Sequence, residues 1–302
     1  MRKLAVAIIA LGFLWISVQI APSQTDAQEK LAPPVLKQAN VHEFGCGPCM
    51  IINTLRFLSK DREFDWSSLP GDSDEARAKR IIDVYGTRDS TTYEGKQRFS
   101  DGFDGMSCRD TVATFQDLLS DAGDPFEISG TFLEKREGES LLGHLNRVHT
   151  LFKRSLDSGL PVPFAIRSFG AKIDEVKSRY FWYGLSQHFV TVVEVQEQLE
   201  ENEKGFKFEF VDSDTGKREF GYICFDEARN FSAIKGNTET YEWLSDRPFL
   251  QVIAPSLRLQ TNKLGFHQRS IMTANFGIFE KQIVDDLATK QSASDVADNQ
   301  RK

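Results

Sequence analysis

The chain reads Phe-Gly-Cys-Gly-Pro-Cys-Met over residues 44–50 and continues into an apolar stretch with helical spacing (Ile51, Ile52, Leu55 and Leu58). This pattern predicts a helix over 46–59. Backbone N–H groups in the first turn of a helix are unpaired and the helix dipole is positive there, so a thiolate is stabilised and its pKa falls. The sequence therefore predicts a nucleophilic thiol at Cys46 or Cys49.

The same Cys-Gly-Pro-Cys letters also occur at the redox centre of thioredoxin-like proteins, so the motif alone supports two different chemistries. A thioredoxin centre follows a buried hydrophobic strand, whereas residues 33–45 (PPVLKQANVHEFG) are mixed and polar. A thiol–disulfide oxidoreductase that uses Cys46 and Cys49 therefore stays open as an alternative to a hydrolytic enzyme.

The N-terminus has the order of a secretory signal, with Arg2 and Lys3 before an apolar run over 4–21 and polar residues after it. We expect residues 1–27 to be cleaved and the chain to be exported to the periplasm or the extracellular space. An uncleaved membrane anchor is the alternative. The formal net charge of −7, from 37 basic and 44 acidic side chains, argues against a nucleic-acid partner.

The four cysteines are too few to form a disulfide scaffold in a chain of 302 residues, so a hydrophobic core must hold the fold. We expect Cys108 and Cys224 to be small buried apolar residues. No metal and no cofactor are expected, because the histidines and cysteines lack paired ligand spacing beyond Cys46-x-x-Cys49.

Downstream patterns place helices first and strands second. Two further helices are predicted between 105 and 123 and over 141–156, each closed by a glycine. Strands are predicted where the period changes to two, over 161–166, 189–195, 206–211, 220–225 and 249–254. Segment 60–104 reads as irregular, with one amphipathic piece at 76–85, and 285–302 has the composition of a loose tail.

This order predicts an α+β domain over 28–256, with N-terminal helices packed on an antiparallel β-sheet. Residues 257–302 are predicted to be a C-terminal extension that is partly disordered.

A thiol nucleophile needs a base and a group that orients the base. His188 directly precedes the most strand-like run of the chain, so it is the candidate base. Asp212 ends the next strand, and an antiparallel hairpin brings the two positions together. We expect Asp212 to accept the Nδ1 proton of His188 and Asp214 to cap the turn through Gly216. His144 and His149, within a predicted helix, are expected to be surface or packing residues.

Five segments carry a family resemblance in their order and spacing: Cys46-Gly47-Pro48, the Gly-Met-Ser at 105–107, KRSLDSGLPV at 153–162, Gln187-His188-Phe189-Val190, and Asp212-Ser213-Asp214-Thr215-Gly216. Over about residues 36–230 the chain resembles the bacteriocin-processing cysteine peptidases and their stand-alone, papain-like relatives. The resemblance implies a papain-like cysteine peptidase fold and a peptide or protein substrate. It also implies that Cys46 is the nucleophile, His188 the base and Asp212 the orienting carboxylate.

The family usually has a glutamine six residues before the nucleophile to bind the oxyanion, and this chain has Asn40 there. Asn40 is therefore the candidate oxyanion donor, and Gln38 is a second candidate with worse spacing. Ser213 also stands where the family commonly has proline. These departures leave open a third function, a catalytically inactive peptidase-like module that binds a peptide without cutting it.

Overall fold

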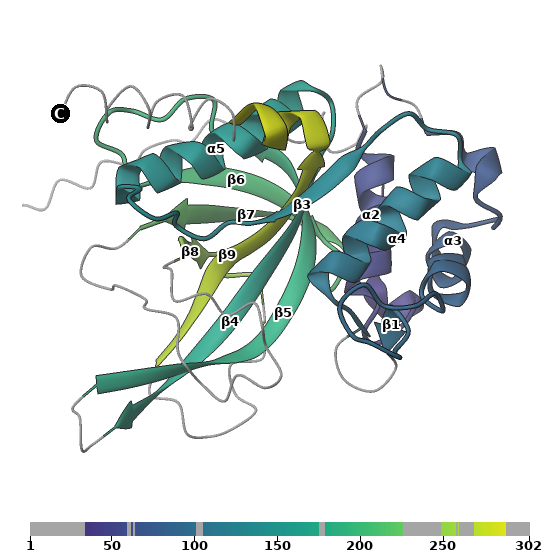
Figure 1. Ribbon diagram of the computed structural model, residues 1–302, viewed down its shortest axis with the longest axis horizontal. Coiled ribbons are helices and arrows are strands. Elements are labelled where there is room, and N and C mark those ends of the chain that lie inside the picture. Colours follow the sequence, from purple (N-terminus) through teal and green to yellow (C-terminus); the bar gives the residue numbers. More distant parts are fainter. Residues whose placement is uncertain are drawn as a thin grey trace, which may run out of the picture. The chain divides into compact units, whose positions relative to one another are not determined.

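Six antiparallel strands close into a β-barrel, which dominates the architecture (Figure 1). In chain order they are β4 (Val162–Asp174), β5 (Arg179–Val195), β6 (Gly205–Asp212), β7 (Lys217–Cys224), β8 (Gln251–Ile253) and β9 (Arg269–Glu280). Each strand pairs with the next, and β9 pairs with both β8 and β4, which closes the ring. The short strand β3 (Ile128–Phe132) adds to β9 beside the ring.

The predicted papain-like α+β fold, with helices on an antiparallel sheet, is wrong, because the sheet closes into a barrel. The closing strand β9 lies in the segment after residue 257, where the sequence analysis predicted no strand. β3 was also not predicted. A period-two pattern identifies a strand but not its partners, so closure of a sheet cannot be read from it.

The computed structural model describes residues 34–58, 62, 64–100, 105–174, 179–225, 249–257, 259 and 269–287. The predicted signal over 1–27 and residues 288–302 of the predicted tail lie outside these ranges. Residues 34–302 group into one unit. Within the described ranges, none of the helices combines the length and the apolar character needed to cross a bilayer.

β5 is buried on both faces because it contributes to two hydrophobic clusters. On β5, Phe189 belongs to the first cluster, which the N-terminal helices share, while Val190 and Val192 belong to the second. The second cluster joins the other face of the strands to α5 (Leu141–Asp157). Successive residues of a strand point to opposite faces, so this double burial explains the almost continuously apolar run over 189–193 of β5.

Three predicted helices are confirmed. They are α2 (Cys46–Arg56), α4 (Cys108–Asp121) and α5 (Leu141–Asp157). Serine side chains cap two of them: Ser107 accepts the N–H of Asp110 and Ser140 accepts that of Gly143. The amphipathic piece predicted at 76–85 is helical as α3 (Asp74–Arg80) and the π-helical turn η3 (Ile81–Tyr85).

Other short elements fill the rest of the N-terminal region. They are the 3-10 turns η1 (Gln38–Asn40) and η2 (Trp66–Ser68), and the two-stranded pair of β1 (Phe99–Ser100) with β2 (Gly105–Met106). Figure 1 shows α2, α3 and α4 grouped on one side of the strands, with α5 lying across them.

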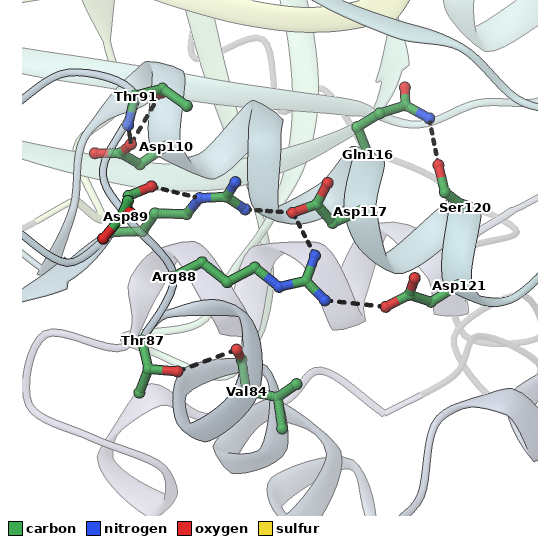
Figure 2. Close-up of polar contacts among 11 residues, drawn as sticks. Val84, Thr87, Arg88, Asp89, Thr91, Asp110, Gln116, Asp117, Ser120 and Asp121 are labelled. Carbon is green, nitrogen blue, oxygen red and sulfur yellow. Dashed lines mark hydrogen bonds and ion pairs between the residues drawn. The ribbon is translucent and has the colours of Figure 1, made fainter.

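The segment between η3 and β1 is attached to α4 through charged contacts (Figure 2). Arg88 and Arg98 both donate to Asp117 at 2.6 Å. Asp110, which is buried, accepts hydrogen bonds from the backbone and hydroxyl of Thr91. A buried carboxylate is stable only when its oxygens are satisfied, so these bonds hold the polar segment against the helix.

α2 is attached to β5 by a buried pair of threonines. The hydroxyls of Thr54 and Thr191 lie 3.2 Å apart, and Thr191 also donates to the carbonyl of Met50 at 3.2 Å. Both threonines are fully buried. Because Cys46 begins α2 and His188 lies on β5, this polar link connects the two elements that carry the predicted nucleophile and base.

Candidate active site

Cys46 is the first residue of α2, where the sequence predicted a reactive thiol. Gly45 supplies the N-cap without a side chain, so no side-chain oxygen competes for the N–H groups of the first turn. The backbone N–H groups of Gly47 and Phe189 lie where they lower the pKa of the Cys46 thiol. A helix start and a strand therefore both direct N–H donors at this sulfur, which favours its ionised form.

His188 lies on β5 with 7% of its surface exposed, and its imidazole contacts two of the predicted site residues. Its Nε2 lies 2.7 Å from Oδ1 of Asp212, and the Cys46 thiol is close enough to raise the pKa of the ring together with that carboxylate. Since Nε2 faces the carboxylate, Nδ1 is the nitrogen left for the sulfur. The prediction that Asp212 would bind Nδ1 of His188 is therefore wrong, because the ring is oriented with Nε2 towards the carboxylate.

Asp212 is the last residue of β6 and is 1% exposed. Its Oδ1 accepts the N–H of Asp214 at 2.9 Å, and its carbonyl accepts the N–H of Gly216 at 2.8 Å. Gly216 has a positive φ of 69°, which a glycine adopts without strain. The turn after β6 thus fixes the carboxylate that faces His188.

The charges of these three side chains stabilise one another. Burial would raise the pKa of Cys46, but the hydrogen bond and charge of His188 and the two backbone N–H groups lower it overall. Burial would lower the pKa of His188, but Asp212 and Cys46 raise it to about 10. The pKa of Asp212 is lowered: burial opposes this, and the imidazole and neighbouring N–H groups outweigh it. All three shifts favour the same charge state, in which a thiolate and an imidazolium are backed by a carboxylate.

The two candidate oxyanion donors lie in η1 but differ in surroundings. The side chain of Asn40 is exposed, and its Nδ2 donates to Glu75 at 3.5 Å. The backbone N–H of Gln38 donates to the carbonyl of Ser213 at 2.7 Å, beside Asp212. The side-chain amide of Gln38 donates to the carbonyl of Glu43, in the turn that leads to Cys46. Gln38 thus spans the turns before Cys46 and after Asp212.

Cys108 lies near Cys46 and His188, a position that was not predicted from the sequence. It opens α4, its sulfur accepts a hydrogen bond from Nε2 of Gln187 at 3.3 Å, and burial raises its pKa to about 12. The prediction that it is a buried residue is confirmed. The sequence predicted only that Cys108 begins a helix. It did not indicate that Cys108 lies beside Gln187, the neighbour of His188.

Other histidines have structural contacts. His144 is 1% exposed and its Nε2 bonds the carbonyl of Leu133 at 2.7 Å, while burial lowers its pKa to about 4. His149 bonds the carbonyl of Gln196 and packs against Phe206. Both are packing residues, as predicted, and His267 lies outside the described residues.

In the part of the chain that the structure describes, no three histidine, cysteine, aspartate or glutamate side chains converge as metal ligands. No protein-family model, no curated protein and no solved structure matches this chain.

Proposed function

We propose that this chain is a cysteine-dependent hydrolase that cleaves a peptide or amide bond through Cys46, His188 and Asp212. The observation that supports this most is the position of His188, which faces the Cys46 thiol with one side of its ring and Asp212 with the other. Catalytic constellations of this kind occur on unrelated folds, so the proposal concerns the site and not the fold.

The reaction follows from the charges of the resting site. The Cys46 thiolate attacks the substrate carbonyl carbon, and the negative charge moves to the carbonyl oxygen. The C–N bond then breaks as the imidazolium of His188 gives its proton to the leaving amine. A water molecule, deprotonated by the now neutral His188, attacks the thioester, releases the acid and restores the thiolate. Asp212 keeps the ring oriented and stabilises its charged form throughout.

We further propose Gln38 as the oxyanion donor, in preference to Asn40. Gln38 contacts the turns on both sides of the site, whereas Asn40 is exposed and donates to Glu75. Removing one oxyanion donor typically lowers kcat by about 10²–10³. We expect Gln38→Ala to reduce kcat by that order and Asn40→Ala to leave it nearly unchanged. The reverse ranking of the two variants would assign the role to Asn40.

The test of the hydrolase is peptide cleavage by the full chain, with a mixed library of peptides as the substrate and mass spectrometry as the readout. We expect Cys46→Ala and His188→Ala each to abolish cleavage, while Cys224→Ala, a cysteine on β7, remains active. No cleavage by the wild type, together with selective peptide binding, would indicate the inactive binding module instead. Disulfide reduction that requires both Cys46 and Cys49 would indicate the oxidoreductase.

Export is a proposal of the same kind. It rests on the charged, apolar and polar order of residues 1–27, and N-terminal sequencing of the secreted protein tests it.

A further inference from the structure

The hydrolase mechanism does not use Cys49, although it belongs to the same motif as the nucleophile. Cys46 and Cys49 are the first and fourth residues of α2, and both are free thiols. Cys49 is 0% exposed and packs in the first hydrophobic cluster, whereas Cys46 is partly exposed. Cys46 therefore lies at the edge of the cluster, with part of its surface open to solvent, whereas Cys49 has none.

The helix makes the two cysteines neighbours, because they lie three residues apart in its first turn. Residues three apart on a helix are surface neighbours, with Cβ atoms about 5–6 Å apart. A disulfide needs Cβ atoms about 3.5–4.5 Å apart, so the two side chains must approach by about 1–2 Å from that helical spacing. The residues between them are Gly47 and Pro48, and Gly47 places no side chain in the way. Closure therefore requires a local change of backbone within the first turn of α2, and that turn lies at the end of the helix.

The two thiols differ in the way that a reactive and a resolving cysteine must differ. His188 and backbone N–H groups lower the pKa of Cys46 against its burial. Burial, with the negative charge of Cys46 as a second cause, raises the pKa of Cys49. Oxidation of Cys46 removes that negative charge, so Cys49 loses its proton more readily once its neighbour has reacted.

We propose that Cys46 and Cys49 are a reversible oxidation site, at which a hydroperoxide oxidises Cys46 and Cys49 closes a disulfide with it. This inference rests on the proposed function in taking Cys46 as the reactive thiol. The disulfide removes the nucleophile, so the oxidised chain does not hydrolyse peptides.

Two steps complete the reaction. The Cys46 thiolate attacks the peroxide, the O–O bond breaks, and Cys46 becomes a sulfenic acid while His188 gives its proton to the departing oxygen. The Cys49 sulfur then attacks the Cys46 sulfur, the S–O bond breaks, and water leaves with the Cys49 proton. With hydrogen peroxide the sum is two thiols and one peroxide giving one disulfide and two waters. A dithiol reductant reverses it.

Cys108 is the competing partner for Cys46, because the two sulfurs influence each other electrostatically. It lies on a different helix, and Gln187 donates a hydrogen bond to it. A bond from Cys46 to Cys108 requires α2 and α4 to move together, whereas a bond to Cys49 requires a change within one helical turn.

The test treats the reduced full chain with hydrogen peroxide and follows the mass of the peptide that contains both Cys46 and Cys49. We expect that peptide to lose two hydrogens, and alkylation of Cys46 by iodoacetamide to fall at least about tenfold and to return after reduction. In Cys49→Ser we expect Cys46 to gain two or three oxygens irreversibly instead. Cys49→Ala repeats the test with a second side chain, and circular dichroism checks that each variant is folded.

The matched controls are Cys108→Ser and Cys224→Ser, which should behave as the wild type. Protection of Cys46 that is lost in Cys108→Ser but kept in Cys49→Ser overturns the inference in favour of the other pair. Irreversible oxidation of Cys46 in the wild type overturns it entirely. Slow alkylation of Cys46 in the untreated, reduced wild type is a different result, because it counts against the proposed function itself.

Discussion

At the residue scale, the state of the site depends on His188, whose imidazole interacts with an acid on each side. The carboxylate of Asp212 and the thiol of Cys46 both favour its protonated form against the effect of burial. The ring is therefore charged at neutral pH, which is the state that a leaving amine requires. Both partners raise the pKa of His188, so substitution of either should lower that pKa measurably.

Substitution of Asp212 by asparagine should remove a part of the protein's stability that depends on pH in a defined way. The raised pKa of His188 contributes stability that is complete below its ordinary value of 6.5 and is lost as pH rises through about 10. The lowered pKa of Asp212 contributes stability above its ordinary value of 3.8 and loses it as pH falls. We therefore expect the Tm difference between wild type and Asp212→Asn to be largest between these two ordinary values and to shrink towards pH 10.

The matched control is Asp214→Asn, an exposed position in the same turn. It should leave Tm unchanged across the pH range. A Tm difference for Asp212→Asn that is constant with pH would mean that the carboxylate and the imidazole do not share charge.

At the element scale, α2 and β5 must be held in register, because one carries the sulfur and the other the imidazole. The hydroxyl of Thr191 links them through Thr54 and the Met50 carbonyl. Loss of a buried hydrogen bond typically costs about 1–2 kcal/mol. We expect Thr191→Val to lower the free energy of unfolding by that amount in urea denaturation, and Thr191→Ser to retain most of it. Equal stability of the valine variant and the wild type would show that the hydroxyl does not hold the elements together.

The bounds of α4 and the start of α5 could be predicted because local chemistry specifies them. Ser107 and Ser140 cap their helices, and the glycine after the 108–121 helix adopts a positive φ. Proximity of His188 and Asp212 could also be predicted, because the hairpin of β5 and β6 is local in sequence. The orientation of the imidazole could not be predicted, because a sequence pattern does not depend on how a side-chain ring is rotated.

At the scale of the whole molecule, the barrel depends on a strand from the end of the chain. β9 pairs with β3, β4 and β8, all of which come earlier in the sequence. In the sequence of β9, apolar and polar residues do not alternate regularly, and polar residues flank the segment. No local pattern therefore indicated a central strand. Pairing over such long separations is a property of the folded chain, and the predicted sheet therefore lacked the strand that closes it.

If β9 belongs to the core, shortening one of its buried side chains should be costly. Phe279 on β9 is 0% exposed and its ring centroid lies 5.9 Å from that of Phe152 in α5. We expect Phe279→Ala to lower the free energy of unfolding by about 3–5 kcal/mol. The matched control Phe220→Ala, at a position that is 67% exposed on β7, should change it by less than about 0.5 kcal/mol. Similar losses for the two variants would contradict the placement of β9.

The most direct test of the catalytic site is the rate of Cys46 alkylation by iodoacetamide as a function of pH. We expect the wild type to react with a midpoint below 9.0, the ordinary pKa of a thiol, because His188 stabilises the thiolate. In His188→Ala the midpoint should rise to 9.0 or above, since burial then acts without that partner, while His144→Ala should match the wild type. A wild-type midpoint at or above 9.0, or one that His188→Ala does not change, would contradict the account.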